Sequence, residues 1–444
     1  MSLKAFDPVL PQSHVDPRPT SKMGGFLLFC LVFLFVGRAH EALGGPIRFN
    51  LLFTAATLLF CVKDFLSNPL MYFKESTVLR RITYFTLWAI AMIPFSRWPG
   101  GSVETAIGFL KVYTFVLLTA VLLTRYRLTA VGVFAHVVSL LVVLFFSAIT
   151  ESASVRVYTI TKSYDPNEMA LIAVMILPIL FFAIKNAKFI WKAAFTGGVA
   201  VCVVAIALSG SRGGMLGLFM VGAYVLFVSS ISMLKKVLIV IMSVLVFIVA
   251  VPQENLTRLV NTLDIENDYN VSGKQGRLVV WAADLEKIIK NPIAGVGLGQ
   301  STTLTEEEMD EGVWMEAHNS YIEMALETGI PGFCFLFSVM LISWRRLREL
   351  RRTLDKKDPR LPLVHGLEAG LWGYFVCITF LSVAFYALSL FFFVMIEAVY
   401  RDIKGQHLRP VAGEESAQPE PEPEQKKKKR RYKLKQGSSY DPRT

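Results

Sequence analysis

The feature that most constrains this chain is a series of apolar segments, each close to the length of a membrane-spanning helix, between residues 23 and 400. A helix needs about twenty apolar residues to cross the hydrocarbon core of a bilayer. With 53% hydrophobic residues, the 444-residue chain has more apolar surface than one soluble core could bury. The sequence therefore predicts an all-α polytopic membrane protein.

We expect about twelve transmembrane helices. The last two are the hardest to separate, because no charged or proline-rich break divides Leu367 from Tyr400; this stretch is either one long hairpin or two closely joined spans. The twelve segments lie at approximately 23–38, 46–62, 79–96, 103–124, 128–149, 169–184, 189–208, 213–229, 235–252, 317–343, 367–381 and 382–400.

The positions of lysine and arginine predict the orientation. If the N-terminus is cytoplasmic, every cytoplasmic connection is basic, as the positive-inside rule requires. The longest connection, 253–316, contains many acids and few basic residues, so we expect it to be periplasmic. An even number of spans also places the C-terminus in the cytoplasm. The basic residues assigned to the cytoplasm are Lys63, Lys74, Arg80, Arg81, Arg125, Arg127, Lys185, Lys188, Lys192, Lys235, Lys236 and those from Arg345 to Arg360.

The N-terminal segment lacks an apolar region followed by a small-residue cleavage site, so we expect the first span to insert uncleaved. The tail is rich in Pro, Glu and Lys, and we expect it to be disordered. The predicted parts are a cytoplasmic segment (1–22), transmembrane helices one to nine (23–252), a large, partly helical periplasmic loop between spans nine and ten (253–316), transmembrane helices ten to twelve (317–400) and the basic cytoplasmic tail (401–444).

Several chemistries are disfavoured by composition and spacing. The formal charge of +11 comes from short loops and the tail, which is typical of membrane topology rather than of a nucleic-acid-binding face. All five cysteines lie in apolar segments, so neither a disulfide framework nor a CxxC metal site is expected. Neither an HExxH nor a DxD spacing indicates a metal site.

Within the long loop, 276–290 has a helical pattern that should end before Pro292. Gly295, Gly297 and Gly299 follow and predict a flexible turn. Their spacing does not match that of a phosphate-binding loop, and no Lys-Ser/Thr pair follows. The glycines are therefore weak evidence for nucleotide binding.

His318 stands at the start of the tenth apolar segment. A neutral imidazole can accept a proton from a sugar hydroxyl near neutral pH, so this position suits a general base. Taken alone, an interfacial histidine is more often a structural hydrogen-bonding residue. Glu316 and Glu323 are close enough in sequence to tune it, whereas the acidic run at 306–311 is typical of a solvated loop.

Two arginines are candidates for binding an anion. Arg212 lies among small residues between two apolar segments, where its planar guanidinium could contact phosphate through two hydrogen bonds. Arg277 begins the helical pattern in the long loop and could face the same anion. The alternatives are an arginine that extends to the lipid headgroups for Arg212 and a solvated charge for Arg277.

Taken together, these motifs resemble those of the O-antigen ligase and polymerase superfamily. The most specific element is a His-Asn pair followed, after nine residues, by Gly and, after two more, by a second Gly. The predicted helix layout extends the resemblance over most of the chain, with the motifs concentrated in residues 165–332. The matching positions are Pro166-Asn167-Glu168, Arg212 with Leu216, Arg277, Asn291-Pro292 before Gly295, Gly297 and Gly299, and His318-Asn319 with Gly329 and Gly332.

Members of this superfamily transfer a glycan from undecaprenyl diphosphate to a periplasmic acceptor, which for the ligases is the lipid A-core oligosaccharide. The resemblance implies an inverting, metal-independent transfer without a cofactor, at the periplasmic face of a bacterial inner membrane. It implies His318 as the catalytic base and Arg212 and Arg277 as diphosphate-binding residues. Asn319 and Tyr321 are candidates for orienting the imidazole. The expected partners are the two lipid-anchored substrates and membrane lipids, but no nucleic acid.

Three other functions remain open. A polymerase of the same superfamily would join two lipid-linked glycans, and a protein O-oligosaccharyltransferase would use a protein hydroxyl. The compact plan without an added periplasmic domain favours the ligase, by analogy of fold. A transporter, a different class, would need charged residues buried within its spans, for which Lys111 is the main candidate.

Overall fold

The computed structural model describes residues 21–39, 41, 48–67, 70–150, 164–229, 232–238, 276–302 and 316–405. These residues belong to one compact unit, and their regular structure is helical throughout. The helices are α1 (Lys22–Phe35), α3 (Phe49–Ser67), α4 (Met71–Glu75), α5 (Thr77–Ala91), α6 (Pro99–Arg125), α7 (Thr129–Thr150), α8 (Pro166–Ala183), α9 (Phe189–Ser209), α10 (Arg212–Val228), α14 (Arg277–Lys290), α16 (Ser320–Thr353), α17 (Leu361–Cys377) and α18 (Ala387–Ile403), with the 3₁₀ turns η2 (Ile93–Phe95), η3 (Ile184–Asn186) and η4 (Ile378–Phe380).

Among the described residues, seven helices are long and apolar enough to cross a membrane: α3, α6, α7, α8, α9, α16 and α17. Helices α1 and α10 are apolar but shorter. The chain is thus an all-α, multi-pass membrane protein, while the count of twelve spans is not confirmed. The expected ninth span, 235–252, lies mostly outside the described residues, as do 253–275 and 303–315 of the expected periplasmic loop and residues 406–444 of the tail.

The helix bounds differ from the apolar segments in two places. Helix α16 continues to Thr353, ten residues beyond the expected end of its span. Its last turns are rich in arginine, so the apolar pattern ends before the helix does. Apolar length measures the part of a helix that lipid can surround, not the whole helix. Helix α18 begins at Ala387 rather than at 382, and an extended segment after Leu381 separates it from α17. The stretch from Leu367 to Tyr400 is therefore two helices.

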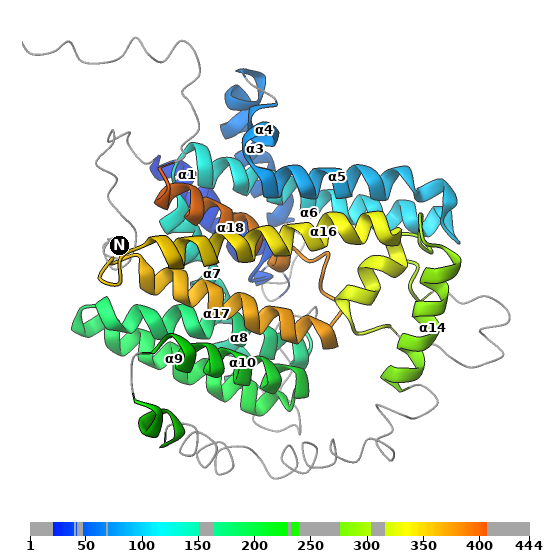
Figure 1. The fold of residues 1–444 in the computed structure, drawn as a ribbon. Helices are drawn as coiled ribbons and strands as arrows, with labels where there is room; N and C mark the ends of the chain where they lie inside the picture. Colours follow the sequence, from blue (N-terminus) through cyan, green and yellow to red (C-terminus); the bar gives the residue numbers. More distant parts are fainter. Residues whose placement is uncertain are drawn as a thin grey trace, which may run out of the picture. The chain divides into compact units, whose positions relative to one another are not determined.

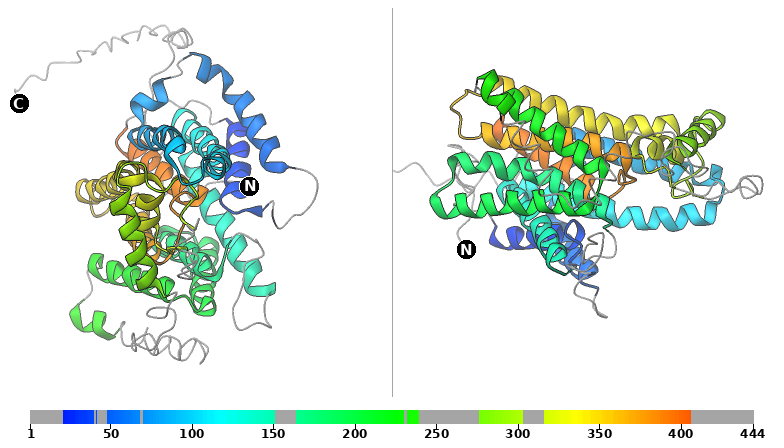
Figure 2. Two further views of the ribbon diagram at one scale, coloured as in Figure 1. Left: turned by 90° about the vertical axis from the view of Figure 1, so that its right-hand side faces the viewer. Right: turned by 90° about the horizontal axis from the view of Figure 1, so that it is seen from below.

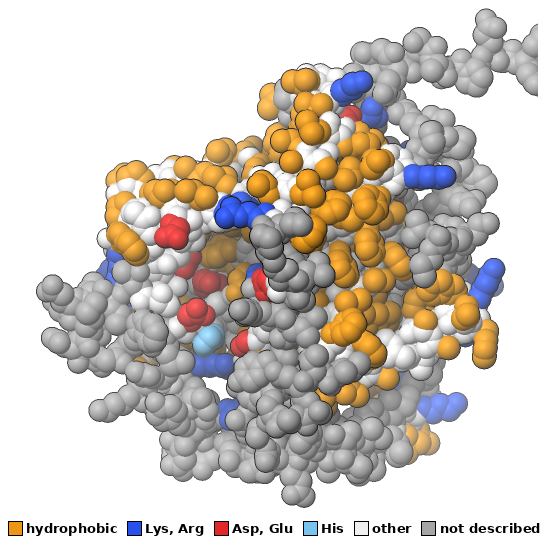
Figure 3. All heavy atoms as spheres, turned by 180° about the vertical axis from the view of Figure 1, so that it is seen from behind, with side chains coloured by type: hydrophobic (Ala, Val, Ile, Leu, Met, Phe, Trp, Pro, Cys, Tyr) orange, Lys and Arg blue, Asp and Glu red, His pale blue; other side chains and the backbone are white. Residues whose placement is uncertain are grey.

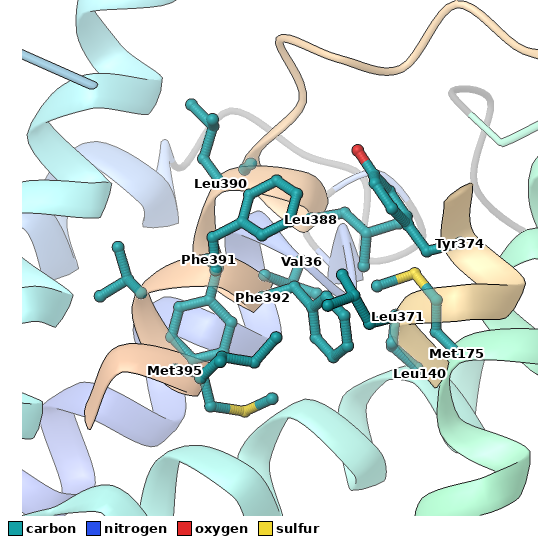
Figure 4. Packing of buried hydrophobic residues seen from close by; sticks show 14 of the residues in the cluster. Val36, Leu140, Met175, Leu371, Tyr374, Leu388, Leu390, Phe391, Phe392 and Met395 are labelled. Atoms are coloured by element: carbon teal, nitrogen blue, oxygen red, sulfur yellow. The ribbon is translucent and has the colours of Figure 1, made fainter. Parts of the chain in front are cut away.

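The long helices run side by side, and α14 crosses one end of them (Figures 1 and 2). Helix α8 packs against α9, α10 and α17 and is buried along most of its length, as is α18. Phe391, Phe392 and Met395 of α18 meet side chains of α7, α8 and α17 in the core shown in Figure 4. The helices whose ends form the site pack around this buried core.

Glycines allow the closest of these contacts, between α8 and α17. An ideal Cβ atom on Gly370 would lie 2.6 Å from the Met175 carbonyl oxygen, and one on Gly366 would lie 2.7 Å from Ile179 Cα. Small residues spaced four apart let two helix backbones approach closely, as in many membrane proteins. The pair of glycines therefore sets the spacing of the two helices.

Buried ion pairs join the helices at the end of the bundle far from α14. Glu397 of α18 lies 2.6 Å from the Arg346 guanidinium of α16 and accepts a hydrogen bond from Ser76, the N-cap of α5. Arg351 pairs with the buried Glu368 at 2.7 Å. This end coincides with the basic connections of the sequence, including the Arg345 to Arg360 stretch.

Candidate functional site

The starts of four helices, α8, α10, α14 and α16, meet at the opposite end of the bundle, together with the segment that follows η4. Figure 3 shows a hollow on the far face of the molecule where acidic, basic and histidine side chains gather between apolar areas. Helix starts expose unpaired backbone N–H groups and carry a partial positive charge. Such an arrangement favours the binding of an anion.

Helix α14 occurs where the loop pattern predicted it, between the N-cap Gly276 and Asn291. Trp281 Nε1 donates a hydrogen bond to the Ala317 carbonyl oxygen at 2.7 Å. Ile288 packs with Val296 against Leu326 of α16. The helix is thereby fixed directly beside the chain that leads to His318.

The glycine turn after α14 has a structural explanation. Gly295, Gly297 and Gly299 all have positive φ angles, between 70° and 110°. The turn runs against α16, where Val296 N donates to the Leu326 carbonyl oxygen at 2.7 Å and Gly299 N donates to Glu327 Oε2 at 2.8 Å. The glycines therefore allow the backbones of the turn and of α16 to approach closely.

The same approach bends α16. Gly329 interrupts the helix with φ 69° and ψ 177°, a conformation essentially restricted to glycine. A Cβ atom at this position would collide with the Ile293 carbonyl oxygen. Ile330 N donates across the same contact to the Pro292 carbonyl oxygen at 2.8 Å. Gly329 of the sequence motif thus forms the kink against which the turn after α14 packs.

His318 precedes α16 in a left-handed backbone conformation, with φ 43°. Its side chain is about one-third exposed, and its Nδ1 lies 3.8 Å from Glu316 Oε2. Asn319 caps α16, since its side-chain oxygen accepts hydrogen bonds from Tyr321 N at 3.0 Å and Ile322 N at 3.2 Å. The Tyr321 hydroxyl donates to the Phe375 carbonyl oxygen at 3.0 Å. Both residues thus anchor the backbone that carries the histidine.

Partial burial lowers the pKa of His318 below its ordinary value. Glu316 and Asp165 oppose the shift, whereas the charge of Arg277 reinforces it. The hydrogen bond from Trp281 to the Ala317 carbonyl, one turn of α14 after Arg277, is the contact that joins this helix to the residue before His318. A lowered pKa leaves the imidazole neutral at pH 7, the form that can accept a proton.

Phe380 of η4 connects the two arginines that the sequence singled out. The Arg277 guanidinium lies 5.8 Å from the centroid of the Phe380 ring. The same side chain packs against Gly213, where an ideal Cβ atom would lie 3.1 Å from Phe380 Cβ. Gly213 directly follows Arg212, which opens α10 after its N-cap Ser211. The structure therefore brings the starts of α14 and α10 to one aromatic ring, which Arg277 contacts through its guanidinium and α10 through Gly213.

Arg38 is a third arginine near the site and was not predicted from the sequence. Its guanidinium lies 5.0 Å from the centroid of the Tyr164 ring and 5.2 Å from that of Tyr386, and Nη1 lies 3.3 Å from Glu41 Oε1. The Tyr164 hydroxyl donates to the Val36 carbonyl oxygen at 2.7 Å. The only signal in the sequence is a charged residue at the edge of an apolar segment, which is common to many membrane proteins.

Helix α8 begins with the Asp165-Pro166-Asn167-Glu168 motif. Asp165 accepts a hydrogen bond from Glu168 N at 2.8 Å, and the Glu168 side chain accepts one from Asp165 N at 2.9 Å. This capping box satisfies two backbone donors and fixes the direction in which the helix starts. The motif thus fixes the start of α8 directly after Tyr164, whose ring contacts Arg38.

Within the described residues, no group of three or more His, Cys, Asp or Glu side chains is arranged to hold a metal ion. The acids that follow His318 in α16 have other surroundings. Glu327 accepts the hydrogen bond of the glycine turn, and Glu323 lies one turn inside α16. What the site offers is a histidine, at least two arginines and four helix starts.

Comparison with known families places part of the chain in a known family. Residues 197–337 match the family model described as O-antigen ligase. The matched region runs from α9 into α16 and includes Arg212, Arg277, His318 and the kink at Gly329. No curated protein matches the chain in sequence.

Proposed function

As a member of the O-antigen ligase superfamily, this chain has the character of a membrane glycan transferase, and we propose that it is an O-antigen ligase. It transfers the glycan of undecaprenyl diphosphate to the lipid A-core oligosaccharide at the periplasmic face of a bacterial inner membrane. The observation that carries the proposal is that the start of α14 meets the other site elements. Trp281, one turn after Arg277, donates to the carbonyl of Ala317, the residue before His318, and Arg277 shares the Phe380 ring with the start of α10.

In the proposed reaction His318 is the general base. Its neutral imidazole takes the proton of an acceptor hydroxyl, and the oxygen forms a bond to the anomeric carbon of the donor sugar. The bond from that carbon to the diphosphate oxygen breaks on the opposite face, so the configuration inverts. The lowered pKa of His318 supports this role, because the base is ready at pH 7.

Arg212 and Arg277 bind the diphosphate as it leaves. Negative charge accumulates on the leaving group, and guanidinium groups in a partly desolvated site stabilise it more than they would in bulk water. The four helix starts add partial positive charge. A diphosphate is a good leaving group, so the proposed mechanism needs neither a metal ion nor another cofactor.

The membrane contributes by confinement. Both proposed substrates have lipid tails, so the bilayer holds them while their headgroups meet at the end of the bundle, which lowers the entropic barrier. The periplasmic assignment of this end is supported by the basic residues at the other end. Impermeant thiol labelling of Glu286→Cys in intact inner membranes tests it: labelling only after the membrane is broken would reverse the orientation.

The competing functions differ in the acceptor. A polymerase uses a second lipid-linked glycan, and a protein O-oligosaccharyltransferase uses a protein hydroxyl. The transporter has less support, because its main candidate, Lys111, is exposed on α6 rather than buried between helices.

The deciding experiment is transfer in vitro with purified full-length protein and lipid-linked glycan. Parallel reactions receive lipid A-core, a second lipid-linked glycan or an acceptor protein. The ligase proposal expects the glycan on lipid A-core alone. Elongation of the lipid-linked glycan would replace it with the polymerase, and glycosylated protein with the protein transferase. Movement of lipid-linked glycan across vesicles without transfer would indicate a transporter.

A further inference from the structure

Helix α14 has two apolar faces, of which only one is explained by packing. Val280 and Ile288 lie on the face that contacts the rest of the protein. A second stripe, about 130° around the helix at 100° per residue, is exposed. It consists of Leu278, Ala282, Leu285 and Ile289 and is continued by Ile293 in the following turn. Ile289 is 77% exposed and Leu285 50%.

The depth of α14 follows from its contact with α16. The arginine-rich end of α16 begins at Arg345, and a hydrocarbon core of about 30 Å corresponds to about twenty helical residues. Counted back from Arg345, the straight part of α16 reaches the kink at Gly329 after about 24 Å, so the other boundary of the core falls just beyond the kink. Ile288 and Val296 pack against Ala325 and Leu326. Helix α14 therefore lies at the membrane boundary rather than in open solvent.

Neighbouring residues mark the same level. The Arg97 backbone N–H donates to the Val296 carbonyl oxygen at 2.8 Å, which joins the turn after α14 to the connection between α5 and α6. Trp98, in that connection, is exposed, and tryptophan is enriched where a membrane meets water. Exposed Ile330, at the kink of α16, lies beside the same turn. Exposed Trp98 and Ile330 are thus joined through the backbone to the turn that follows the stripe.

Charged residues flank the stripe. Glu286 and Lys290 lie beside the stripe and form an exposed ion pair of 2.8 Å. The helix also runs across the end of the bundle, as a helix in the plane of a membrane would (Figures 1 and 2). An exposed apolar face flanked by charged residues is typical of a helix that lies in the membrane interface.

We propose that α14 is an interfacial helix whose stripe of Leu278, Ala282, Leu285 and Ile289 lies among the acyl chains of the adjoining leaflet. The occupant of this face is lipid, because α14 packs on α16 at the membrane boundary and exposed Trp98 and Ile330 flank the turn that follows it. Arg277, at the start of the helix, is then held at the height of lipid phosphates. If the proposed function holds, this is the height at which the diphosphate of the donor arrives.

The test is spin-label accessibility in full-length protein reconstituted into phospholipid nanodiscs. Single cysteines replace Leu285, Ile289 and, as the matched control, Glu286, in a background whose native cysteines are changed to alanine. Oxygen partitions into the acyl chains and a nickel chelate remains in water. We expect a higher oxygen-to-nickel collision ratio at 285 and 289 than at 286. Circular dichroism and size-exclusion profiles verify that each variant is folded.

Two results would overturn the inference. Equal nickel accessibility at all three positions would place the stripe in water. Labels at 285 and 289 that are immobile and reached by neither reagent would mean that protein, such as a second copy, covers the stripe. The measurement does not depend on catalysis: lipid-exposed labels on a protein that transfers no glycan would sink the proposed function and leave the interfacial helix standing.

Discussion

His318 is held by its neighbours in the chain rather than by a network around its ring. The Ala317 carbonyl on one side accepts the Trp281 indole N–H, and Asn319 on the other side caps α16. Between them the backbone of His318 adopts a positive φ, which non-glycine residues seldom do and which is frequent at functional sites. The arrangement leaves the imidazole partly exposed to a substrate.

Replacing His318 by Ala should slow transfer by on the order of a hundredfold to ten-thousandfold, because the acceptor hydroxyl then has no general base. Binding of the lipid-linked donor should persist. Single-turnover transfer and donor binding are measured on the same preparation, with Glu286→Gln on the exposed part of α14 as a control of unchanged rate. Near-normal turnover by the alanine variant would mean that another group, with Glu316 and Glu323 the next candidates, is the base.

The pH dependence of transfer should report the environment of His318. Because burial lowers its pKa, the rate should rise with pH, and the midpoint of this rise should lie below the ordinary histidine pKa of about 6.5. Glu316 raises this pKa, so Glu316→Gln should move the acidic limb to lower pH. Removing the positive charge in Arg277→Ala should move the limb to higher pH. If the acidic limb stays at the same pH in both variants, a group other than His318 produces it.

Arg212→Ala and Arg277→Ala should each weaken transition-state binding by about 1.5 to 3 kcal/mol, the range for hydrogen bonds to charged groups. This corresponds to a loss in kcat/KM for the donor of roughly ten- to hundredfold. Lysine should restore only part of the activity, since it lacks the planar fork of arginine. Initial rates against donor concentration measure the effect. Wild-type kcat/KM in either alanine variant would remove that arginine from the diphosphate site.

The kink in α16 should depend on Gly329. Substitution by alanine imposes a backbone conformation that costs about 1 to 3 kcal/mol for other residues, and its Cβ would collide with the Ile293 carbonyl. We expect a lower midpoint of thermal unfolding in detergent and loosening of the turn after α14. Gly222→Ala in α10 is the matched control, because a Cβ there meets nothing within 4 Å. Equal unfolding midpoints of the two variants would show that the kink tolerates a side chain.

At the scale of the whole molecule, Glu397 joins helices at the end of the bundle opposite the site. Its carboxylate pairs with Arg346 of α16 and accepts hydrogen bonds from the start of α5, including those of Thr77 N and Val78 N at 3.1 Å. One side chain of α18 thus joins three helices. Since the site lies at the other end, these contacts act on it only through the relative positions of the helices.

Glu397→Ala should destabilise the fold by about 3 to 5 kcal/mol, because it leaves the charge of Arg346 without its partner in a largely buried setting. Glu349→Ala removes a more exposed pair with Lys404, 2.8 Å apart in the wild type, and should cost about 1 kcal/mol or less. Denaturant or thermal unfolding of both variants in one detergent compares them. A cost for Glu397 no greater than that for Glu349 would mean that this cluster does not hold the helices together.

The sequence by itself determined the helical class, most helix positions and α14, because apolar runs, a helix start at Arg277 and a proline stop are local signals. It also singled out His318, Arg212 and Arg277, since their motif is a pattern of spacing. Their chemical roles remain predictions. The capping box at Asp165 is likewise contained in four consecutive residues.

Only the tertiary structure decided which distant residues meet. The contact of Arg38 with Tyr164 and Tyr386 joins positions more than a hundred residues apart, and Glu397 reaches Ser76 across 321 residues. The sequence predicted a flexible turn at the three glycines. The structure shows this turn hydrogen-bonded to α16 on both sides of the kink at Gly329. Such contacts depend on how helices pack, and packing is set by the shapes of all the side chains in the interface rather than by any local pattern.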